Sequence, residues 1–413
     1  MSIRGRIAGW AAMVMVACGS AASHEQKPPS QDLLWIDTGS GLASLEAATG
    51  RVRVNAPQAV AAPDFSEVFS YSSDGADTTL VRRESARGTE LSRMTFPGEF
   101  VANVVSGSEG LVALTEPRAP GATPWMPDGR SLTTVVVADP SAGTEKRYEL
   151  KGNFEPEAFS TNNRRLYTIE YIPAAAPNRY RVRILNLGNG RVSPIGRLKL
   201  AAPGQMRGTG RMQVLSPGGH ELYTLYTQQG PNYAHGGPVD HNPGATHAFI
   251  HLLNLAEGWA HCIDLPMPFG MGTATASAVA ISPDGDHLYV VDWTNGAVAV
   301  VKPARLRVTR TVSVALGAAD DQTFATASDD GTLYVAGNDQ VVAMEATSLE
   351  VLNRWQLPNE VVGLAVASDG NRLYAALADR VVVLDASSRE MVGTIPAEQV
   401  ESIVHTVRIG DDA

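Results

Sequence analysis

Residues 282–314 read SPDGDHLYVVDWTNGAVAVVKPARLRVTRTVSV, and this stretch holds the pattern that decides the fold. An Asp-Gly turn precedes a strand containing Leu-Tyr, an Asn-Gly turn leads into a Val-rich strand, and a polar turn leads into a third strand. Asp-Gly and Asn-Gly between apolar runs are strong hairpin signals, because glycine tolerates the positive φ that such turns require. The apolar run TASAVAI before the first turn supplies a fourth strand. The stretch therefore predicts a unit of four antiparallel strands.

The same unit recurs along the chain. Clear copies cover residues 328–357 and 368–395, and weaker copies cover 160–171 and 216–226. Four antiparallel strands in about 40–45 residues, repeated, are typical of the blades of a β-propeller. We therefore predict an all-β protein with a single β-propeller of four-stranded antiparallel blades.

These repeats resemble the YVTN family of β-propellers, and YVVDWTNG at residues 289–296 stands where that family has its name-giving motif. The resemblance implies the propeller fold and a bacterial protein outside the cytoplasm, without implying an activity. It extends to propeller lactonases, but none of their active-site residues can be matched onto this chain. A lactonase-like hydrolase is therefore kept as an alternative function.

The blade count depends on the polar residue that ends the third strand of each repeat. Seven such residues are recognisable: Glu46, Asp139, Asn186, Asn254, Lys302, Glu345 and Asp385. The long gap before Asp139 leaves room for a further blade around residues 68–96, which gives eight blades, with seven as the alternative if that stretch is only a connection. Strand-end acids such as Asp139, Asp292 and Asp385 are expected to cap turns.

The two ends of the repeat region complement each other. LLWID at residues 33–37 looks like the second strand of a blade without its first, and VESIVHTVRI at 400–409 is a strand without a blade. Pairing them would close the ring and remove an open sheet edge that would otherwise invite aggregation. The propeller is therefore expected to span residues 32–409.

The N-terminus has the features of an export signal. Arg4 and Arg6 precede the apolar segment IAGWAAMVMVA at residues 7–17, which is too short to cross a bilayer as a helix. MVACGS at residues 15–20 overlaps the end of this segment and resembles the lipobox of bacterial lipoproteins. The resemblance implies a signal peptide over residues 1–17, lipidation of Cys18 and a flexible tether over 18–31. Cleavage after Ser23, which would release a freely secreted protein, is the alternative.

Composition restricts the partners and the redox chemistry. The net charge of −10 and the lack of a basic patch argue against nucleic acid, and leave the lipid anchor as the only expected contact with a membrane. With only two cysteines, lipidation of Cys18 would leave Cys262 without a disulfide partner, as a buried small apolar residue. We expect a monomer.

One loop of the repeat region is rich in histidine. Within GPNYAHGGPVDHNPGATHAFIH at residues 230–251, a divalent metal such as zinc or copper is a possible cofactor. Its candidate ligands are His235, Asp240, His241 and His247. Their spacing matches no compact zinc motif, so a solvated polar loop and a pocket for an organic ligand stay open. His251 and His261 lie in or beside strands and are expected to pack or to form hydrogen bonds.

The two longest insertions, at residues 172–180 and 227–247, both fall between the second and third strands of neighbouring blades. Such loops emerge on one face of the ring, where binding is expected. The catalytic residues are unknown, since the chain has no nucleophile elbow, no P-loop and no C-x-x-C. We predict a lipid-anchored or secreted envelope scaffold that binds a protein, a glycan or a small ligand on this face. The alternative is a hydrolytic or metal-dependent enzyme, which would show a funnel of convergent charged side chains near the channel.

Overall fold

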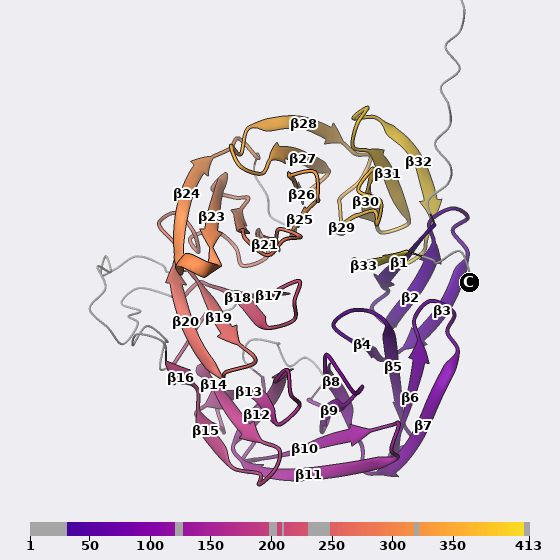
Figure 1. The fold of residues 1–413 in the computed structure, drawn as a ribbon, viewed down its shortest axis with the longest axis vertical. Helices are drawn as coiled ribbons and strands as arrows, with labels where there is room; N and C mark the ends of the chain where they lie inside the picture. Colours follow the sequence, from indigo (N-terminus) through magenta and orange to yellow (C-terminus); the bar gives the residue numbers. More distant parts are fainter. Residues whose placement is uncertain are drawn as a thin grey trace, which may run out of the picture.

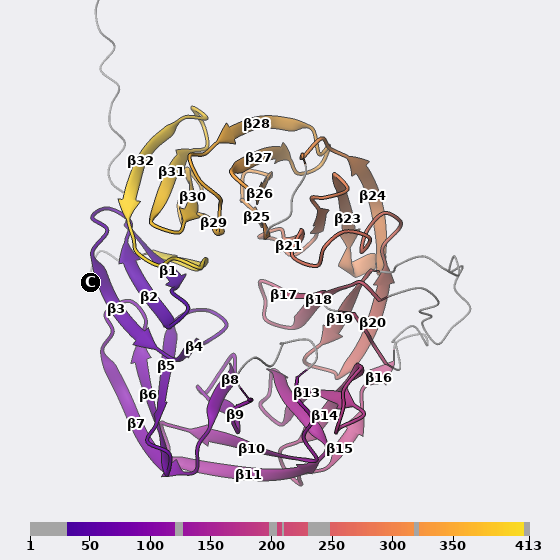
Figure 2. The same cartoon turned by 180° about the vertical axis from the view of Figure 1, so that it is seen from behind.

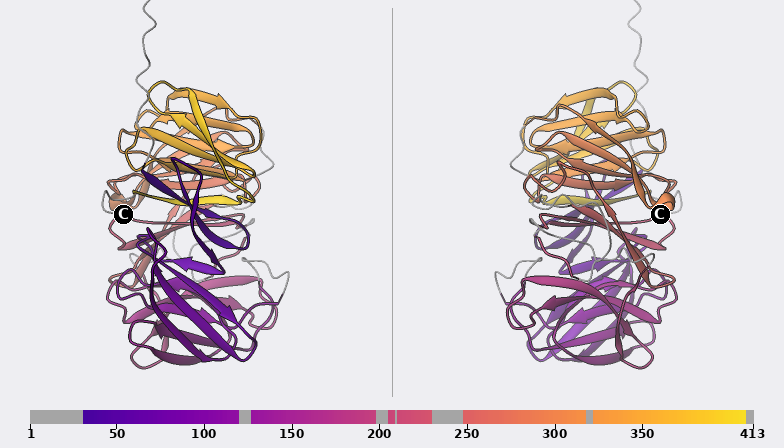
Figure 3. Two further views of the ribbon diagram at one scale, coloured as in Figure 1. Left: turned by 90° about the vertical axis from the view of Figure 1, so that its right-hand side faces the viewer. Right: turned by 90° about the vertical axis from the view of Figure 1, so that its left-hand side faces the viewer.

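The computed structural model describes residues 31–119, 127–197, 205–208, 210–229, 248–317 and 322–408. Eight separate sheets, each with four antiparallel strands, form a ring around a central channel (Figure 1; Figure 2 shows the other face). The propeller and the count of eight are confirmed, and seven blades are excluded. Figure 3 shows the disc from its edge. Within the described residues, no helix has the length and hydropathy needed to cross a membrane.

Blades are numbered in chain order, and the strands of each are given from the channel outward. Blade 1 has β33 (Ser402–Arg408), β1 (Asp32–Asp37), β2 (Gly41–Glu46) and β3 (Val52–Pro57). Blade 2 has β4 (Ala59–Ala61), β5 (Glu67–Ser73), β6 (Asp77–Glu84) and β7 (Glu90–Pro97). Blade 3 has β8 (Val101–Val105), β9 (Val112–Thr115), β10 (Leu132–Asp139) and β11 (Thr144–Lys151). Blade 4 has β12 (Asn153–Phe159), β13 (Arg165–Ile172), β14 (Arg179–Asn186) and β15 (Val192–Pro194).

Blade 5 has β17 (Gly210–Leu215), β18 (Glu221–Thr227), β19 (Phe249–Asn254) and β20 (Trp259–Asp264), to which β16 (Gly196–Arg197) adds a short parallel pairing. Blade 6 has β21 (Ser277–Ile281), β22 (Leu288–Asp292), β23 (Ala297–Lys302) and β24 (Arg307–Ser313), with the 3₁₀ turn η1 (Pro303–Arg305) before β24. Blade 7 has β25 (Thr323–Ala327), β26 (Thr332–Gly337), β27 (Gln340–Glu345) and β28 (Val351–Gln356). Blade 8 has β29 (Gly363–Val366), β30 (Arg372–Leu377), β31 (Arg380–Asp385) and β32 (Met391–Pro396).

The turn after each inner strand explains why the repeats carry a serine there. The Ser160 Oγ accepts a hydrogen bond from the backbone N–H five residues later, over 3.0 Å. The Ser216 and Ser282 hydroxyls accept the equivalent bonds over 3.0 and 2.9 Å. A side chain that replaces a backbone partner in this way fixes the turn between the first and second strands.

Polar residues at the ends of the third strands cap the next turn, as expected. The Asp139 and Asp385 carboxylates each accept hydrogen bonds from two backbone N–H groups in the turn that follows. Asp292, at the end of a second strand, accepts one from the Asn295 N–H over 3.0 Å. Blade 2 is the blade for which the sequence shows no recognisable strand-end residue, and its third strand ends at Glu84.

The ring closes in blade 1, where the C-terminal strand β33 pairs antiparallel with β1. The buried Asp32 carboxylate, at the start of β1, also contacts blade 8. It accepts hydrogen bonds from the Tyr374 hydroxyl over 2.9 Å and from the Ser368 N–H over 3.3 Å. The predicted closure by the C-terminal strand is therefore confirmed, and polar contacts between blades 8 and 1 reinforce it.

Two faces of the disc follow from the strand directions. The connections between second and third strands, and the connections between blades, emerge on one face, which we call the loop face. The tight turns after the first and third strands emerge on the other, which we call the turn face. The apolar core lies between neighbouring blades, and the buried cluster that joins blades 4 and 5 includes Tyr171, Tyr180 and Tyr226.

Candidate functional site

The inner strands surround a central cavity of about 1390 Å³. Over blades 6, 7 and 8 its wall is uncharged and consists mostly of small side chains such as Ala278, Ala325 and Ala365. Over blades 4 and 5 the wall carries Glu157 and Gln213 instead. One sector of the channel is therefore chemically different from most of its wall.

The repeat serines show that this difference is positional. Three residues before the serine, blades 4 and 5 have Glu157 and Gln213, where blades 6 to 8 have Val or Ala. Five residues before it, they have Glu155 and Arg211, where blades 6 to 8 have Ser, Thr or Gly. Charged and amide side chains therefore occupy inner-strand positions that are small in other blades.

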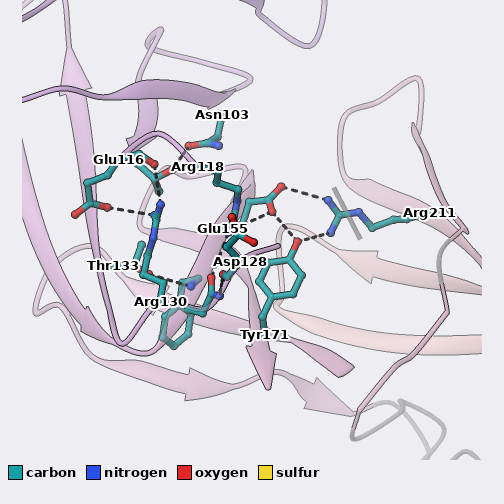
Figure 4. Close-up of polar contacts among 12 residues, drawn as sticks. Asn103, Glu116, Arg118, Asp128, Arg130, Thr133, Glu155, Tyr171 and Arg211 are labelled. Carbon is teal, nitrogen blue, oxygen red and sulfur yellow. Dashed lines mark hydrogen bonds and ion pairs between the residues drawn. The ribbon is translucent and has the colours of Figure 1, made fainter. Parts of the chain in front are cut away.

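Glu155 is the centre of an ion-pair network that joins blades 3, 4 and 5 (Figure 4). Its Oε2 accepts a 2.6 Å hydrogen bond from the Tyr171 hydroxyl and a 3.2 Å contact from Arg118 Nη2. Its Oε1 accepts a 3.3 Å contact from Arg211 Nη2. The Arg118 guanidinium also lies over the Tyr171 ring, 5.3 Å from its centroid. Three donors from three blades therefore converge on the Glu155 carboxyl group.

Arg118 comes from a third insertion, residues 116–131, that the sequence analysis missed. This loop joins the second and third strands of blade 3, so it also lies on the loop face. Arg130 Nη2 donates to the Pro117 carbonyl over 2.9 Å, and the Arg130 backbone N–H donates to the Ala174 carbonyl in the blade 4 insertion over 2.8 Å. Glu116 accepts from the Thr134 N–H over 2.9 and 3.0 Å. The insertions of blades 3 and 4 are therefore joined into one structure above the network.

Glu157 occupies a β-bulge. In the pairing of β12 with β13, Pro156 lies opposite Thr168 and Ala158 opposite Tyr167, so Glu157 has no partner in the ladder. Proline supplies no N–H to a ladder, which favours an irregularity at this point. Bulges re-aim side chains and are frequent beside functional sites. Here the bulge brings the Glu157 carboxyl to Gln213 of the next blade, whose Nε2 donates to Glu157 Oε1 over 2.8 Å.

The second oxygen of this carboxyl is unusual. Glu157 Oε2 is buried and accepts no hydrogen bond. Burial raises the pKa of Glu157 to about 7, which the positive charge of Arg211 opposes and the negative charge of Glu155 reinforces. Glu157 therefore changes its charge near neutral pH, in contact with a cavity.

An aromatic cluster lies beneath the network, between blades 4 and 5. The Tyr180 ring lies 6.1 Å from that of Tyr171 and 5.6 Å from that of Tyr226, between centroids. The His251 ring meets Tyr226 edge-on at 6.0 Å. The Tyr180 hydroxyl donates to the Arg207 carbonyl over 2.9 Å, whereas the buried Tyr226 hydroxyl has no hydrogen-bond partner among the described residues. Burial and the negative charge of Glu157 both raise the pKa of Tyr226.

The residues predicted for metal binding and for lipidation are not among those that the structure describes. His235, Asp240, His241, His247 and Cys18 lie outside the described residues, so metal binding and lipidation stay predictions. In the part of the chain that the structure describes, no group of three or more His, Cys, Asp and Glu side chains is arranged to hold a metal ion.

The remaining histidines and the internal cysteine are where the sequence analysis expected them. His251 lies in β19 and His261 in β20, and both are buried. Cys262 is also buried, and burial raises the pKa of its thiol.

No protein-family model matches the chain, and no curated protein matches its sequence. Among solved structures, Sqt1 of Saccharomyces cerevisiae has 10% sequence identity and a TM-score of 0.51, over 83% of this chain and 85% of that chain. Apo AztD of Citrobacter koseri has 12% identity and a TM-score of 0.38, over 80% of this chain and 95% of that chain. The likeness to Sqt1 supports the propeller fold, and that conclusion is limited to the fold.

Proposed function

We propose that this chain is an exported binding propeller, held at a membrane by lipid on Cys18 or released after cleavage, whose loop face binds a ligand above blades 3 to 5. One observation carries the proposal. Charged groups from three adjacent blades converge on Glu155 at the loop face, while the cavity wall over blades 6 to 8 is uncharged. Rigid scaffolds commonly carry binding residues on loops gathered at one side.

Convergent charged side chains are the feature that the sequence analysis expects of the enzyme alternative, so this arrangement also supports that second candidate. Arg118, Glu155 and Arg211 each keep between about a seventh and a quarter of their side-chain surface exposed, and remain reachable from solvent. A partly exposed guanidinium–carboxylate network can exchange partners with a polar ligand at lower cost than a fully buried one.

The test is photo-crosslinking in cells that produce the protein. A photoreactive residue replaces Ala176, in the exposed blade 4 insertion, and the control replaces Asp329, in an exposed turn of blade 7 on the turn face. Gel shift detects a protein partner, and intact-mass spectrometry detects a small one. Binding at the loop face predicts an adduct from position 176 alone, which disappears when Arg211 is changed to Ala. Equal adducts from both positions, or none, would contradict the proposal.

A hydrolytic enzyme is the second candidate, and the two carboxyl groups of β12 favour it. Glu155 is contacted by three donors, whereas Glu157 has a buried oxygen and burial raises its pKa to about 7. Two carboxyl groups in different environments are typical of acid–base catalysis. Chromogenic lactones, esters and glycosides would test it, with turnover expected in the parent and not in Glu157→Gln.

A further inference from the structure

Glu157 and Tyr226 indicate the chemistry of the ligand, an inference that rests on the proposed function. We propose that the channel wall between blades 4 and 5 is a binding site for a hydroxyl group of a neutral sugar or polyol. The hydroxyl would donate to Glu157 Oε2 and accept from the Tyr226 phenol.

The geometry comes from one layer of blade 5. In the β17–β18 pairing Arg211 lies opposite Tyr226, and Gln213 lies opposite Thr224. Directly paired residues point to the same side of a sheet, so these side chains share the surface that faces blade 4. Gln213 Nε2 bridges that surface to Glu157 Oε1 over 2.8 Å. The Glu157 carboxyl therefore lies against the layer that contains the Tyr226 hydroxyl.

The ligand chemistry follows from which atoms lack partners. The Tyr171 and Tyr180 hydroxyls of the same cluster both donate hydrogen bonds. In the part of the chain that the structure describes, Glu157 Oε2 and the Tyr226 hydroxyl are buried and make none. Leaving a polar atom buried and unpaired costs about 1–3 kcal/mol, and such atoms are rare in folded proteins. Here the two atoms belong to the facing surfaces of blades 4 and 5, and Glu157 also lines the large cavity.

A carboxylate oxygen needs a donor and a phenol needs an acceptor, so one complementary atom must do both. An alcohol oxygen does both, whereas an ammonium only donates and a carboxylate only accepts. Water shares this chemistry, so the experiment has to separate a ligand hydroxyl from a water molecule. Gln213 favours the sugar, because its exposed carboxamide lies on the channel wall beside Glu157 and offers a second polar group to a vicinal hydroxyl.

Access to the pair is through the channel. Gln213 is the exposed partner in the contact with Glu157, and its amide also lies 3.3 Å from Thr224 Oγ1. A rotation of this one flexible side chain would open the carboxyl to the cavity without moving a strand. The cavity itself, about 1390 Å³, leaves room for the rest of a sugar.

The charged and titratable groups around Glu157 set the pH dependence. They are Glu155 on its own strand, Arg211 on β17, Tyr226 on β18 and Tyr180 on β14. Burial raises the pKa of Glu157 to about 7, so the carboxylate acceptor is fully present above neutral pH and is lost below it. Sugar affinity should therefore fall as the pH is lowered from 8 to 6.

The experiment is isothermal titration of the domain spanning residues 24–413 with glucose, galactose, mannose, N-acetylglucosamine, lactose and cellobiose at pH 8. At least one sugar should bind, with an at least tenfold weaker Kd in Glu157→Ala and a severalfold weaker Kd in Tyr226→Phe. Glu149→Ala, an exposed acid on the outer strand β11, is the matched control and should leave Kd unchanged.

Two results would overturn the inference. The first is that none of the six sugars binds at millimolar concentration while Tyr226→Phe lowers Tm, which would assign the pair to a water molecule. The second is sugar binding that neither Glu157→Ala nor Tyr226→Phe weakens. Neither result decides the crosslinking experiment at position 176, so failure of this inference is distinguishable from failure of the proposed function.

Discussion

Replacing Glu157 by Gln should stabilise the protein above neutral pH. Burial raises the pKa of this carboxyl from 4.5 to about 7. Between these two values the folded protein binds more protons than the unfolded chain, so the free energy of unfolding falls as the pH rises through this window. At about 1.4 kcal/mol per pH unit, the penalty above pH 7 is about 3 kcal/mol. Gln keeps the shape of the side chain and carries no titrating group.

The assay is the Tm of the parent and the variant, measured from pH 4.5 to pH 8.5. With an unfolding entropy of about 2.1 cal/mol/K per residue, removal of about 3 kcal/mol should raise Tm by roughly 4 °C above pH 7. The difference should shrink toward zero near pH 4.5. Glu149→Gln, on the exposed outer strand, should show no such trend. A Tm difference that stays constant with pH would refute the assignment of a buried, titrating carboxyl at position 157.

Other positions give further predictions. Asp32→Ala removes the acceptor that joins blades 8 and 1, and should lower the free energy of unfolding by about 1–3 kcal/mol in denaturant titration. Arg211→Met, which leaves a partly buried carboxylate short of one donor, should cost more than Arg380→Met, whose ion pair is about half exposed and contributes at most about 1 kcal/mol. Cys18→Ala should move the protein from the membrane fraction to the soluble fraction, whereas an unchanged distribution would count against the lipid anchor. The purified domain should bind zinc or copper near stoichiometrically by elemental analysis if the histidine loop is a site, and a triple alanine variant should lose the metal. The three positions changed are His235, His241 and His247.

Local sequence predicts the fold well because each repeat carries its own turn chemistry. The repeat serine, the Asp-Gly turn and the Leu-Tyr strand act within a dozen residues, and each finds the hydrogen bonds that the pattern requires. The second strands of blades 1, 2 and 3 lack the Leu-Tyr pair, and the repeat is most degenerate in blade 2, around residues 68–96. The four strands of blade 2 are predicted only from the repeats on both sides of it and from the room that these leave in the ring.

The candidate site was harder to predict, because its parts are distant in the sequence. Arg118, Glu155 and Arg211 come from three blades, and the ring alone brings them together. A usable signal was nevertheless present. Aligning the repeats on their serines places Glu157 and Gln213 where blades 6 to 8 have Ala or Val, and an acid in an inner strand is unexpected. The bulge at Glu157 and its missing partner depend on packing between blades and could not be predicted.

Because the ring is closed, the chain could begin and end at another point of the ring with the same arrangement of blades. Asp32 at the start of β1 lies opposite Arg408 at the end of β33, so the two ends of the domain are neighbours in one hairpin. A short turn could join them. New ends could then be opened at the exposed turn around Gly331, where nothing lies within 4 Å of an added Cβ. Such a circular permutant would keep all eight blades, connect β33 to β1 through the chain and move the closure of the ring to blade 7, between β25 and β26.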